Sequence, residues 1–294
     1  MANTIKFQEE WATKLQDRLA IPQNWKEVAD VLYTDTQIYE FPFVGTASES
    51  ALQTGLTRGN TYTFQDITMS TETLTIGTFD IISELLDRAD EAQSKYAKRM
   101  ERAKLQGDKI NERLERIMQT LFAGATNLGD NGSGGVGLAS TQFAVSATNI
   151  DDIIRGIIEN IHTAKGTKQY LANGGFVEWR PTDWTFLMAF MQANGYQFAD
   201  NALNSGNKNL MGKELMGLYH YLTDSNANHI ACGVRKIAKI GILNATYGKI
   251  YVTEDPAGAS GGNISGIGVN SRLDYGTLLP AVAKTLTFDF NCTV

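Results

Sequence analysis

A glycine-rich segment is the first group of residues in this 294-residue sequence that could carry chemistry. Gly132, Gly134 and Gly137 fit the G-x-G-x-x-G spacing, which places a dinucleotide's pyrophosphate at a helix N-terminus. That site needs a strand before the glycines and a helix after them. Here a long helical pattern precedes them and a strand-like stretch, 138–145, follows. The context therefore argues against nucleotide binding.

The histidines and cysteines lack the spacing of a metal centre or a catalytic group. His162, His220 and His229 stand far apart or without a second ligand, and Cys232 and Cys292 form no C-x-x-C pair. The sequence also contains no phosphate-binding P-loop, no H-E-x-x-H zinc motif and no G-x-S-x-G nucleophile elbow. We therefore expect no catalytic residue, no cofactor and no metal, and we predict that the chain is not an enzyme.

Charge and hydropathy exclude two further classes of protein. The formal net charge is −6, which disfavours a chain whose main task is to neutralise nucleic-acid phosphates. No apolar run approaches the roughly 20 residues of a membrane span, and the N-terminus lacks the apolar core of a secretion signal. We expect a folded chain in a reducing cytosol, with no membrane partner.

The N-terminal residues 5–20 predict a short amphipathic helix that serves as an arm. Its apolar side chains recur at steps of four: Phe7, Trp11, Leu15 and Leu19. The pattern ends before Pro22, because the residue that precedes a proline disfavours the helical conformation. Two interpretations stay open, an arm that docks on another surface and a helix that packs on its own domain.

Residues 38–77 alternate as β-strands do and predict a long hairpin. The alternating large residues are Phe41 and Phe43, then Tyr62 and Phe64, then Leu74 and Ile76. The tip, 44–60, is rich in Gly, Ser, Thr and Ala and has few large apolar side chains. We therefore favour a hairpin that projects from the core over a surface hairpin that folds back on it.

Residues 84–122 show the strongest helical pattern and predict one rod on the order of 50 Å long. Its apolar positions alternate at three and four residues, and its other faces carry mixed charges. A coiled coil is the competing interpretation, weakened by small residues in the stripe. Gly107 lies within the stripe and predicts a close crossing with a neighbouring backbone.

The second half of the chain mixes helices and strands without a regular repeat. A glycine-rich link, 128–138, predicts a domain boundary, and an isoleucine-rich helix begins near Ile150, with Asn149 or Thr148 as its cap. The segment 175–195 predicts a strand, a turn at Pro181 and a helix that ends at Asn194. Further strands are expected at 237–243, at 249–253 and in the tail. The fold class is therefore α+β.

The order of these features resembles the major capsid proteins of tailed bacteriophages of the Hong Kong 97 type. The similarity covers most of the chain and rests on an ordered set of short motifs. They are Asn111-Glu-Arg-Leu-Glu-Arg116, Gly129-Asp-Asn-Gly-Ser-Gly134, Arg180-Pro-Thr-Asp-Trp184, Gly195-Tyr196, Arg272-Leu-Asp-Tyr-Gly276 and Pro280. The resemblance implies a Hong Kong 97-like capsid fold with an N-terminal arm, an extended hairpin (the E-loop), a long spine helix, and peripheral and axial domains.

The resemblance also implies where the chain divides. In this division the arm is 1–35, the E-loop is 36–78, the peripheral domain is 79–148 with 248–283, and the axial domain is 149–247 with 284–294. Contacts between subunits are expected at large or charged side chains of the arm and the E-loop. These candidates are Trp11, Phe41, Phe43, Arg58, Tyr62 and Phe64.

The function implied by the resemblance is structural. Hexamers and pentamers of this chain would tile an icosahedral head, assembled in the bacterial cytoplasm, around double-stranded DNA held without sequence-specific contacts. Some family members join subunits through an E-loop lysine, but no lysine occurs here between Lys26 and Lys95. The N-terminus also lacks a long charged scaffolding segment, so either a separate scaffolding protein is used or the chain is a processed form. Separate scaffolding and portal proteins are expected as partners, with cement proteins as a further expectation.

Two other functions stay open on the sequence alone. The first is the shell of an encapsulin-like nanocompartment, which shares the implied fold and differs in its contents. The second, from another class, is a monomeric binding protein or hydrolase with a deep pocket. For the hydrolase, a residue such as His220 would be needed for turnover.

Overall fold

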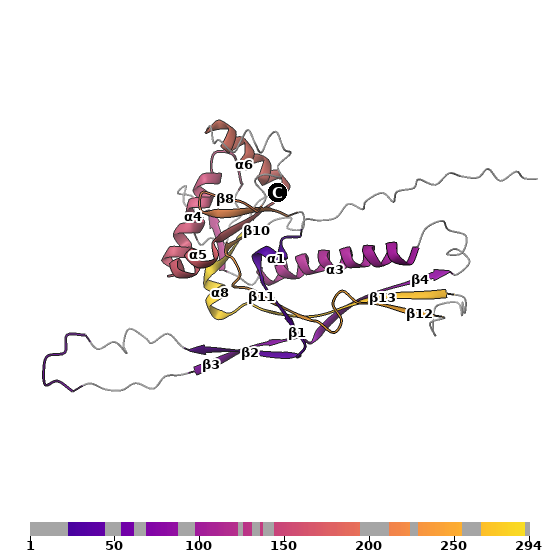
Figure 1. The fold of residues 1–294 in the computed structure, drawn as a ribbon. Helices are drawn as coiled ribbons and strands as arrows, with labels where there is room; N and C mark the ends of the chain where they lie inside the picture. Colours follow the sequence, from indigo (N-terminus) through magenta and orange to yellow (C-terminus); the bar gives the residue numbers. More distant parts are fainter. Residues whose placement is uncertain are drawn as a thin grey trace, which may run out of the picture.

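A computed structural model of the chain describes residues 23–44, 54–61, 69–87, 98–122, 126–130, 136–137, 144–194, 212–223, 229–254 and 266–291. Its helices are α1 Trp25–Val28, α3 Lys98–Phe122, α4 Ile150–Thr163, α5 Thr167–Asn173, α6 Pro181–Ala193 and α8 Ala281–Leu286. Its strands are β1 Asp30–Thr34, β2 Ile38–Val44, β3 Met69–Thr75, β4 Thr78–Asp87, β5 Thr126–Asp130, β6 Val136–Gly137, β7 Gly175–Trp179, β8 Glu214–Leu215, β9 Leu218–Leu222, β10 His229–Val234, β11 Lys239–Leu243, β12 Ile250–Glu254, β13 Gly266–Leu278 and β14 Thr287–Asn291. The α+β class is confirmed (Figure 1).

The first sheet is built on the long strand β13. Its order is β1-β11-β13-β12, and β4 pairs with β13 along most of its length. Helix α3 lies along one face, where Gln106 Nε2 donates to the Val269 carbonyl (3.0 Å) and the Ser271 hydroxyl donates to Gln106 Oε1 (2.6 Å). The predicted spine helix is therefore present and packs lengthwise on this sheet (Figure 1).

The predicted start of that helix, at residue 84, is wrong. Residues 84–87 belong to β4, which forms an antiparallel ladder with β13 from Thr78 to Asp87. Leucine and glutamate at 84–86 favour helices locally, but the ladder partners lie about 180 residues away in the sequence and override that preference. The close crossing predicted at Gly107 is not found among the described residues, because a Cβ atom there would meet no atom within 4 Å.

The second sheet has the order β6-β5-β14-β10-β7-β9-β8 and carries α4 and α6 on one face. The isoleucines of α4 and the apolar side chains of α6 form its core with Val177 and Trp179 of β7. The predicted isoleucine-rich helix, the strand near 175 and the helix that follows it are confirmed.

Three local predictions in this half need correction. Asn149 is the N-cap residue of α4, as predicted, but its side chain makes no capping hydrogen bond, because its Oδ1 accepts the Ser146 N–H instead (2.8 Å). Pro181 is the first residue of α6 and not part of a turn, as its fixed φ and missing N–H suit the first helical position. The glycine-rich link contains two paired strands, β5 and β6, in its described part.

Helix α3 is shared between the two sheets. One apolar cluster contains Ile110, Leu114 and Met118 of α3 with Ile240 and Ile242 of the first sheet. The same cluster includes residues of the second sheet, and the rings of Phe122 and Phe176 lie 5.3 Å apart. Both sheets therefore bury their facing sides against one helix.

The predicted division into domains stays a prediction. Strand β11, which lies within 149–247, pairs with β13, all of which lies within 248–283. Strand β1, within the predicted arm, runs parallel to β11 in the same sheet. The two sheets are thus distinct layers, but the chain passes between them more often than the predicted boundaries imply.

His220 is a structural residue of the second core. The Trp179 Nε1–H donates to His220 Nδ1 (2.8 Å), so the ring is neutral and carries its proton on Nε2, 3.1 Å from the Leu215 carbonyl. Burial lowers the pKa of His220 to about 4. Both ring nitrogens are engaged in a fully buried site, so this histidine is not available as a general base.

Candidate subunit interface

The hairpin formed by β2 and β3 is anchored at its base to the body of the molecule. Leu74 and Ile76 are buried, and the Ile76 N–H donates to the Gln37 carbonyl (2.7 Å). The carboxylate of Glu72 accepts the backbone N–H of Ala281 at the start of α8 (2.9 Å). These contacts fix the direction in which the hairpin leaves the first sheet.

Two glycines of the first sheet allow the hairpin to approach. A Cβ at Gly276 would lie 2.2 Å from the Thr75 carbonyl oxygen, which is shorter than any real contact. A Cβ at Gly241 would lie 2.8 Å from a methyl group of Leu74. Any larger residue at position 276 would therefore push the base of the hairpin off the sheet.

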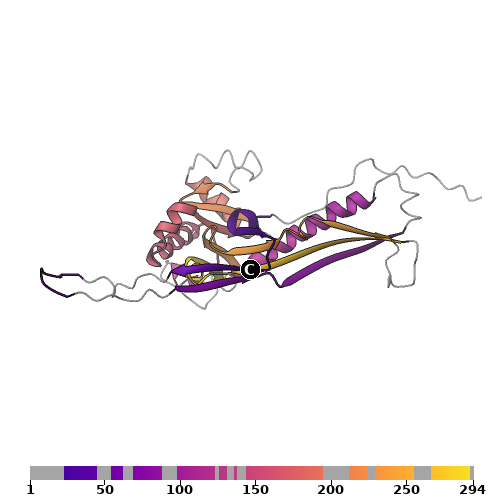
Figure 2. The same cartoon turned by 60° about the horizontal axis from the view of Figure 1, so that its bottom comes forward.

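The far end of the hairpin is exposed in the single chain. Residues 54–61 turn at Arg58-Gly59, where the Asn60 N–H donates to the Thr57 carbonyl (3.0 Å), and Leu56 is 49% exposed. Figures 1 and 2 show this end projecting well away from both sheets. The predicted projecting hairpin is confirmed. No described residue of the same chain covers residues 54–61 at its tip.

The six predicted contact residues fall in three places. Phe41 lies on β2 and is half-buried, with the Lys239 ammonium 4.5 Å from its ring centre. Phe43 lies two residues further along the same strand, opposite Ser70. Arg58 is exposed in the tip. Trp11, Tyr62 and Phe64 lie outside the described residues. That these side chains contact other subunits stays a prediction.

A second exposed apolar surface was not predicted from the sequence. We call it the open face: Phe79, Ile81 and Leu85 of β4 with Tyr251 of β12, on the side of the first sheet away from α3. These side chains are 54%, 51%, 44% and 45% exposed. The Arg272 guanidinium lies 4.5 Å from the Phe79 ring centre. An exposed apolar patch of this kind is a candidate contact surface.

The open face follows from strand alternation. Asp80, Ile82 and Glu84 point toward α3, where Asp80 pairs with Arg113 (2.8 Å), so the intervening residues point the other way. The sequence signal for this exposed surface is that Phe79, Ile81 and Leu85 all occupy odd positions, so they fall on one side of a strand. The predicted helix over 84–122 includes Leu85, so the alternation of this strand was not recognised.

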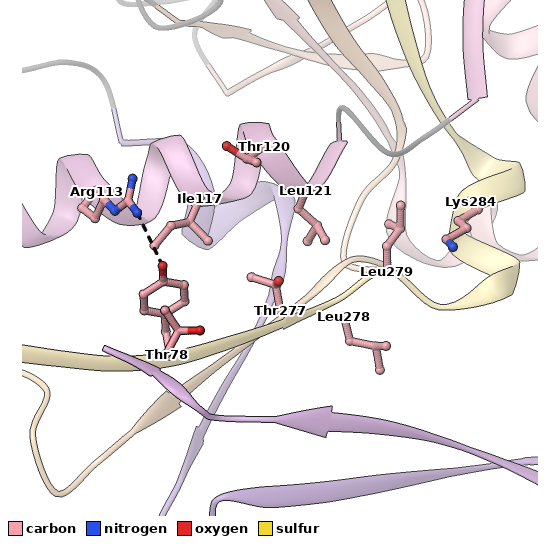
Figure 3. A pocket seen from close by; sticks show the side chains of 10 residues that line it. Thr78, Arg113, Ile117, Thr120, Leu121, Thr277, Leu278, Leu279 and Lys284 are labelled. Atoms are coloured by element: carbon pink, nitrogen blue, oxygen red, sulfur yellow. Dashed lines mark hydrogen bonds between the residues drawn. The ribbon is translucent and has the colours of Figure 1, made fainter. Parts of the chain in front are cut away.

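A cavity of about 630 Å³ opens between α3 and the end of β13 (Figure 3). The Arg113 guanidinium points to the Tyr275 hydroxyl (3.5 Å). The polar residues that line the cavity are Thr78, Arg113, Thr120, Tyr275, Thr277 and Lys284. Among the described residues that line it there is no histidine, cysteine or carboxylate, so the described lining shows no hydroxyl activated by a histidine or a carboxylate.

Neither a metal site nor a membrane helix is found in the part of the chain that the structure describes. Within it, no three His, Cys, Asp or Glu side chains gather as metal ligands. None of its helices combines the length and the apolar character needed to cross a membrane. The surfaces that stand out among the described residues are the hairpin and the open face.

Comparison with known proteins finds similarity in structure and not in sequence. No protein-family model and no curated protein sequence matches the chain. A solved structure from Mycobacterium phage Che8 matches with a TM-score of 0.69 at 13% identity, over 99% of this chain and 98% of that one. The capsid of Ralstonia phage GP4 matches with a TM-score of 0.59 at 11% identity, over 100% of this chain and 99% of that one. The capsid structure of the cyanophage P-SCSP1u gives 0.59 at 12%, over 98% and 93%.

The chain has a phage capsid fold. The match runs over nearly the whole chain, so the Hong Kong 97-like fold implied by the motif order is confirmed. In this capsid fold the β2–β3 hairpin corresponds to the predicted E-loop, and α3 corresponds to the predicted spine helix. The hairpin is therefore an element of the capsid fold. Its contacts with other subunits are a proposal.

Proposed function

We propose that this chain is the major capsid protein of a tailed bacteriophage. Its hexamers and pentamers would tile an icosahedral head around double-stranded DNA, after assembly in the bacterial cytoplasm. The observation that carries the proposal is the full-length match to phage capsid structures, in which neither chain has a large part without a counterpart. The exposed hairpin and the open face support it, because both are surfaces suited to burial against further copies.

The proposed shell would have DNA and other capsid-assembly proteins as partners. A chain with a net charge of −6 would enclose DNA without base-specific contacts. Separate scaffolding and portal proteins are part of the same proposal, with cement proteins as a further expectation. Since no lysine lies between Lys26 and Lys95, the hairpin itself would form no isopeptide bond through lysine, and many weak contacts would add up across the shell instead.

Electron microscopy of the purified, expressed chain tests the proposal. We expect closed shells or sheets of hexamers, with or without a coexpressed scaffold. A chain that stays a monodisperse monomer under all assembly conditions, with a scaffold present, would contradict it. An encapsulin-like compartment also predicts shells, but with a cargo enzyme inside when they are purified from the native source; a phage head contains DNA.

The hydrolase alternative is not supported by the described residues. His220, the residue proposed for it, is fully buried and bonded through both ring nitrogens. Replacement of this histidine would therefore change stability before it changed any turnover.

The open face provides a test of assembly that leaves the hairpin intact. We expect Ile81→Asp to fold as the parent does but to lose at least about 90% of shell assembly, because burial of an unpaired carboxylate at a contact costs several kcal/mol. Light scattering during assembly and sedimentation velocity measure the loss. The matched control is Leu171→Asp on α5, a more exposed leucine far from this sheet. Normal assembly of Ile81→Asp would exclude the open face as a contact.

A further inference from the structure

Two buried carboxylates lie on the facing sides of helix α3 and the second sheet. Glu115 of α3 and Glu178 of β7 have no exposed surface. Neither oxygen of Glu178, nor Oε1 of Glu115, has a hydrogen-bond partner among the described residues. A buried polar group without a partner costs free energy, and a buried charge costs more. This arrangement therefore needs a physical explanation.

The helix and the strand hold the two carboxylates together. Glu115, Gln119 and Phe122 follow each other by four and three residues, so they share one face of α3. Gln119 Nε2 donates to the Thr223 hydroxyl, and Phe122 contacts Phe176, which shares the α3 side of β7 with Glu178. The contacts on both sides leave the carboxylates little room to separate. We call this contact between α3 and the second sheet the joint.

The joint also holds the first described residues of the chain. Glu115 Oε2 accepts the backbone N–H groups of Asn24 (2.7 Å) and Trp25 (2.9 Å) at the start of α1. The Asn24 side chain donates to the Leu222 carbonyl of β9 (2.8 Å), and Trp25 is fully buried. The segment that enters α1 is thus tied to the spine helix and to the second sheet at one point.

We propose that the Glu115–Glu178 pair makes the joint pH-sensitive: it is closed while the pair retains a proton, and ionisation of both carboxylates loosens α3 and α1 from the second sheet. The proposal concerns the folded chain and does not rest on the proposed shell function. Its physical basis is that two like charges in close contact and away from water repel each other strongly.

The charged and titratable groups around the joint do not neutralise the pair. No ion pair joins either carboxylate to a cation of the described residues; Arg235 instead donates to the Tyr221 hydroxyl (3.2 Å), and Arg180 is held by Asp183 (2.6 Å). Lys26 lies over the Trp25 ring (5.0 Å). Tyr221 of β9 lies opposite Glu178 in the ladder and carries no positive charge. The acidic groups on these elements are Glu27 of α1, Glu112 of α3 and Asp289 of β14, and the cations of α3 near the joint, Lys109, Arg113 and Arg116, are exposed. Lys109 pairs with Glu112 (3.2 Å) and Arg113 with Asp80 (2.8 Å).

The direction of the pH effect follows from burial. Desolvation raises the pKa of Glu115 to about 7, from an ordinary value of 4.5. Desolvation and the nearby Glu115 charge raise the pKa of Glu178 well above that value. The folded chain therefore holds protons that the unfolded chain has lost, so the stabilisation is complete below about 4.5 and is lost as the pH rises through about 7.

Hydrogen–deuterium exchange on the full chain tests this inference between pH 6 and 9. After correction for intrinsic exchange, we expect protection of the amides in 24–28 and 115–122 to fall by up to about tenfold per pH unit for each proton released on opening. Glu178→Gln keeps the shape and removes one of the two carboxylates, so the fall in protection with pH is expected to be clearly weaker than in the parent; with Glu115→Gln added, protection in these segments is expected to be nearly independent of pH. Glu159→Gln, an exposed carboxylate on α4, is the matched control and is expected to behave as the parent does.

Two results would overturn the inference. One is a Glu178→Gln variant that retains the parent's pH dependence, and the other is a parent chain without any loss of protection at the joint as pH rises. If Glu178→Gln does not fold, infrared spectroscopy of the folded parent decides. A protonated-carboxyl band is expected at pH 6, reduced in Glu115→Gln and unchanged in Glu159→Gln; absence of that band from the parent would exclude a shared proton.

Discussion

Deletion of residues 45–59 is expected to leave a folded chain that no longer closes shells. The described part of this segment, 54–59, is exposed and contributes nothing to either core. The ladder from Ile38–Val44 to Met69–Thr75 and the anchoring of Glu72 lie outside the deletion, so the base of the hairpin is retained. Sedimentation velocity should then show capsomers or monomers in place of shells, and electron microscopy should show no closed particles.

A length-matched variant separates the effect of side chains from that of loop length. In it, residues 45–59 are replaced by an equal number of Gly and Ser residues, and we expect the same loss of shells if side chains of the tip make the contacts. If this variant assembles while the deletion does not, assembly depends on the length of the loop and not on its side chains. Shells of normal size from the deletion itself would refute the assignment of the hairpin as an assembly element.

The second large effect is expected from Asp183→Ala, which should destabilise the folded chain by about 3–5 kcal/mol. Asp183 and Arg180 form a bidentate pair at the start of α6, with distances of 2.6 and 2.9 Å, and both side chains are buried. Removal of the carboxylate leaves a buried guanidinium without this partner and removes a negative charge from the helix N-terminus. Urea unfolding of the unassembled, hairpin-deleted chain measures the change free of contributions from subunit contacts.

An exposed ion pair on the neighbouring helix provides the matched comparison. Arg155 pairs with Asp152 (3.0 Å) near the start of α4, and both side chains are substantially exposed. Asp152→Ala is therefore expected to cost at most about 1 kcal/mol. Equal losses for the two variants would show that burial does not set the contribution of the Arg180–Asp183 pair.

Elements with a strong local pattern could be predicted from the sequence. The isoleucine spacing of α4 and the alternation in β3 and β14 are visible within ten to fifteen residues, because each element turns one face to the protein interior. The short motif from Arg180 to Trp184 was noted for its order in the chain. The structure supplies its local reason: it combines a helix start at Pro181 with a buried ion pair.

Elements whose state depends on distant partners could not be predicted in the same way. Residues 84–87 are good helix formers, yet they form a strand because β13 supplies a continuous ladder. The open face was missed for the same reason, since exposure of Phe79 and Ile81 depends on which side α3 covers. Local preference is worth a few tenths of a kcal/mol per residue, and tertiary pairing exceeds it.

By itself, the sequence determined the α+β class, the projecting hairpin, the spine helix and, through the order of its motifs, the resemblance to capsid proteins. Only the tertiary structure decided where β1 and β4 pair, which face of the first sheet stays open, and that Glu115 meets Glu178. These features join residues that are tens to hundreds of positions apart. Periodicity reports how a segment divides its own faces between core and solvent, and it carries no information on which distant segment covers them.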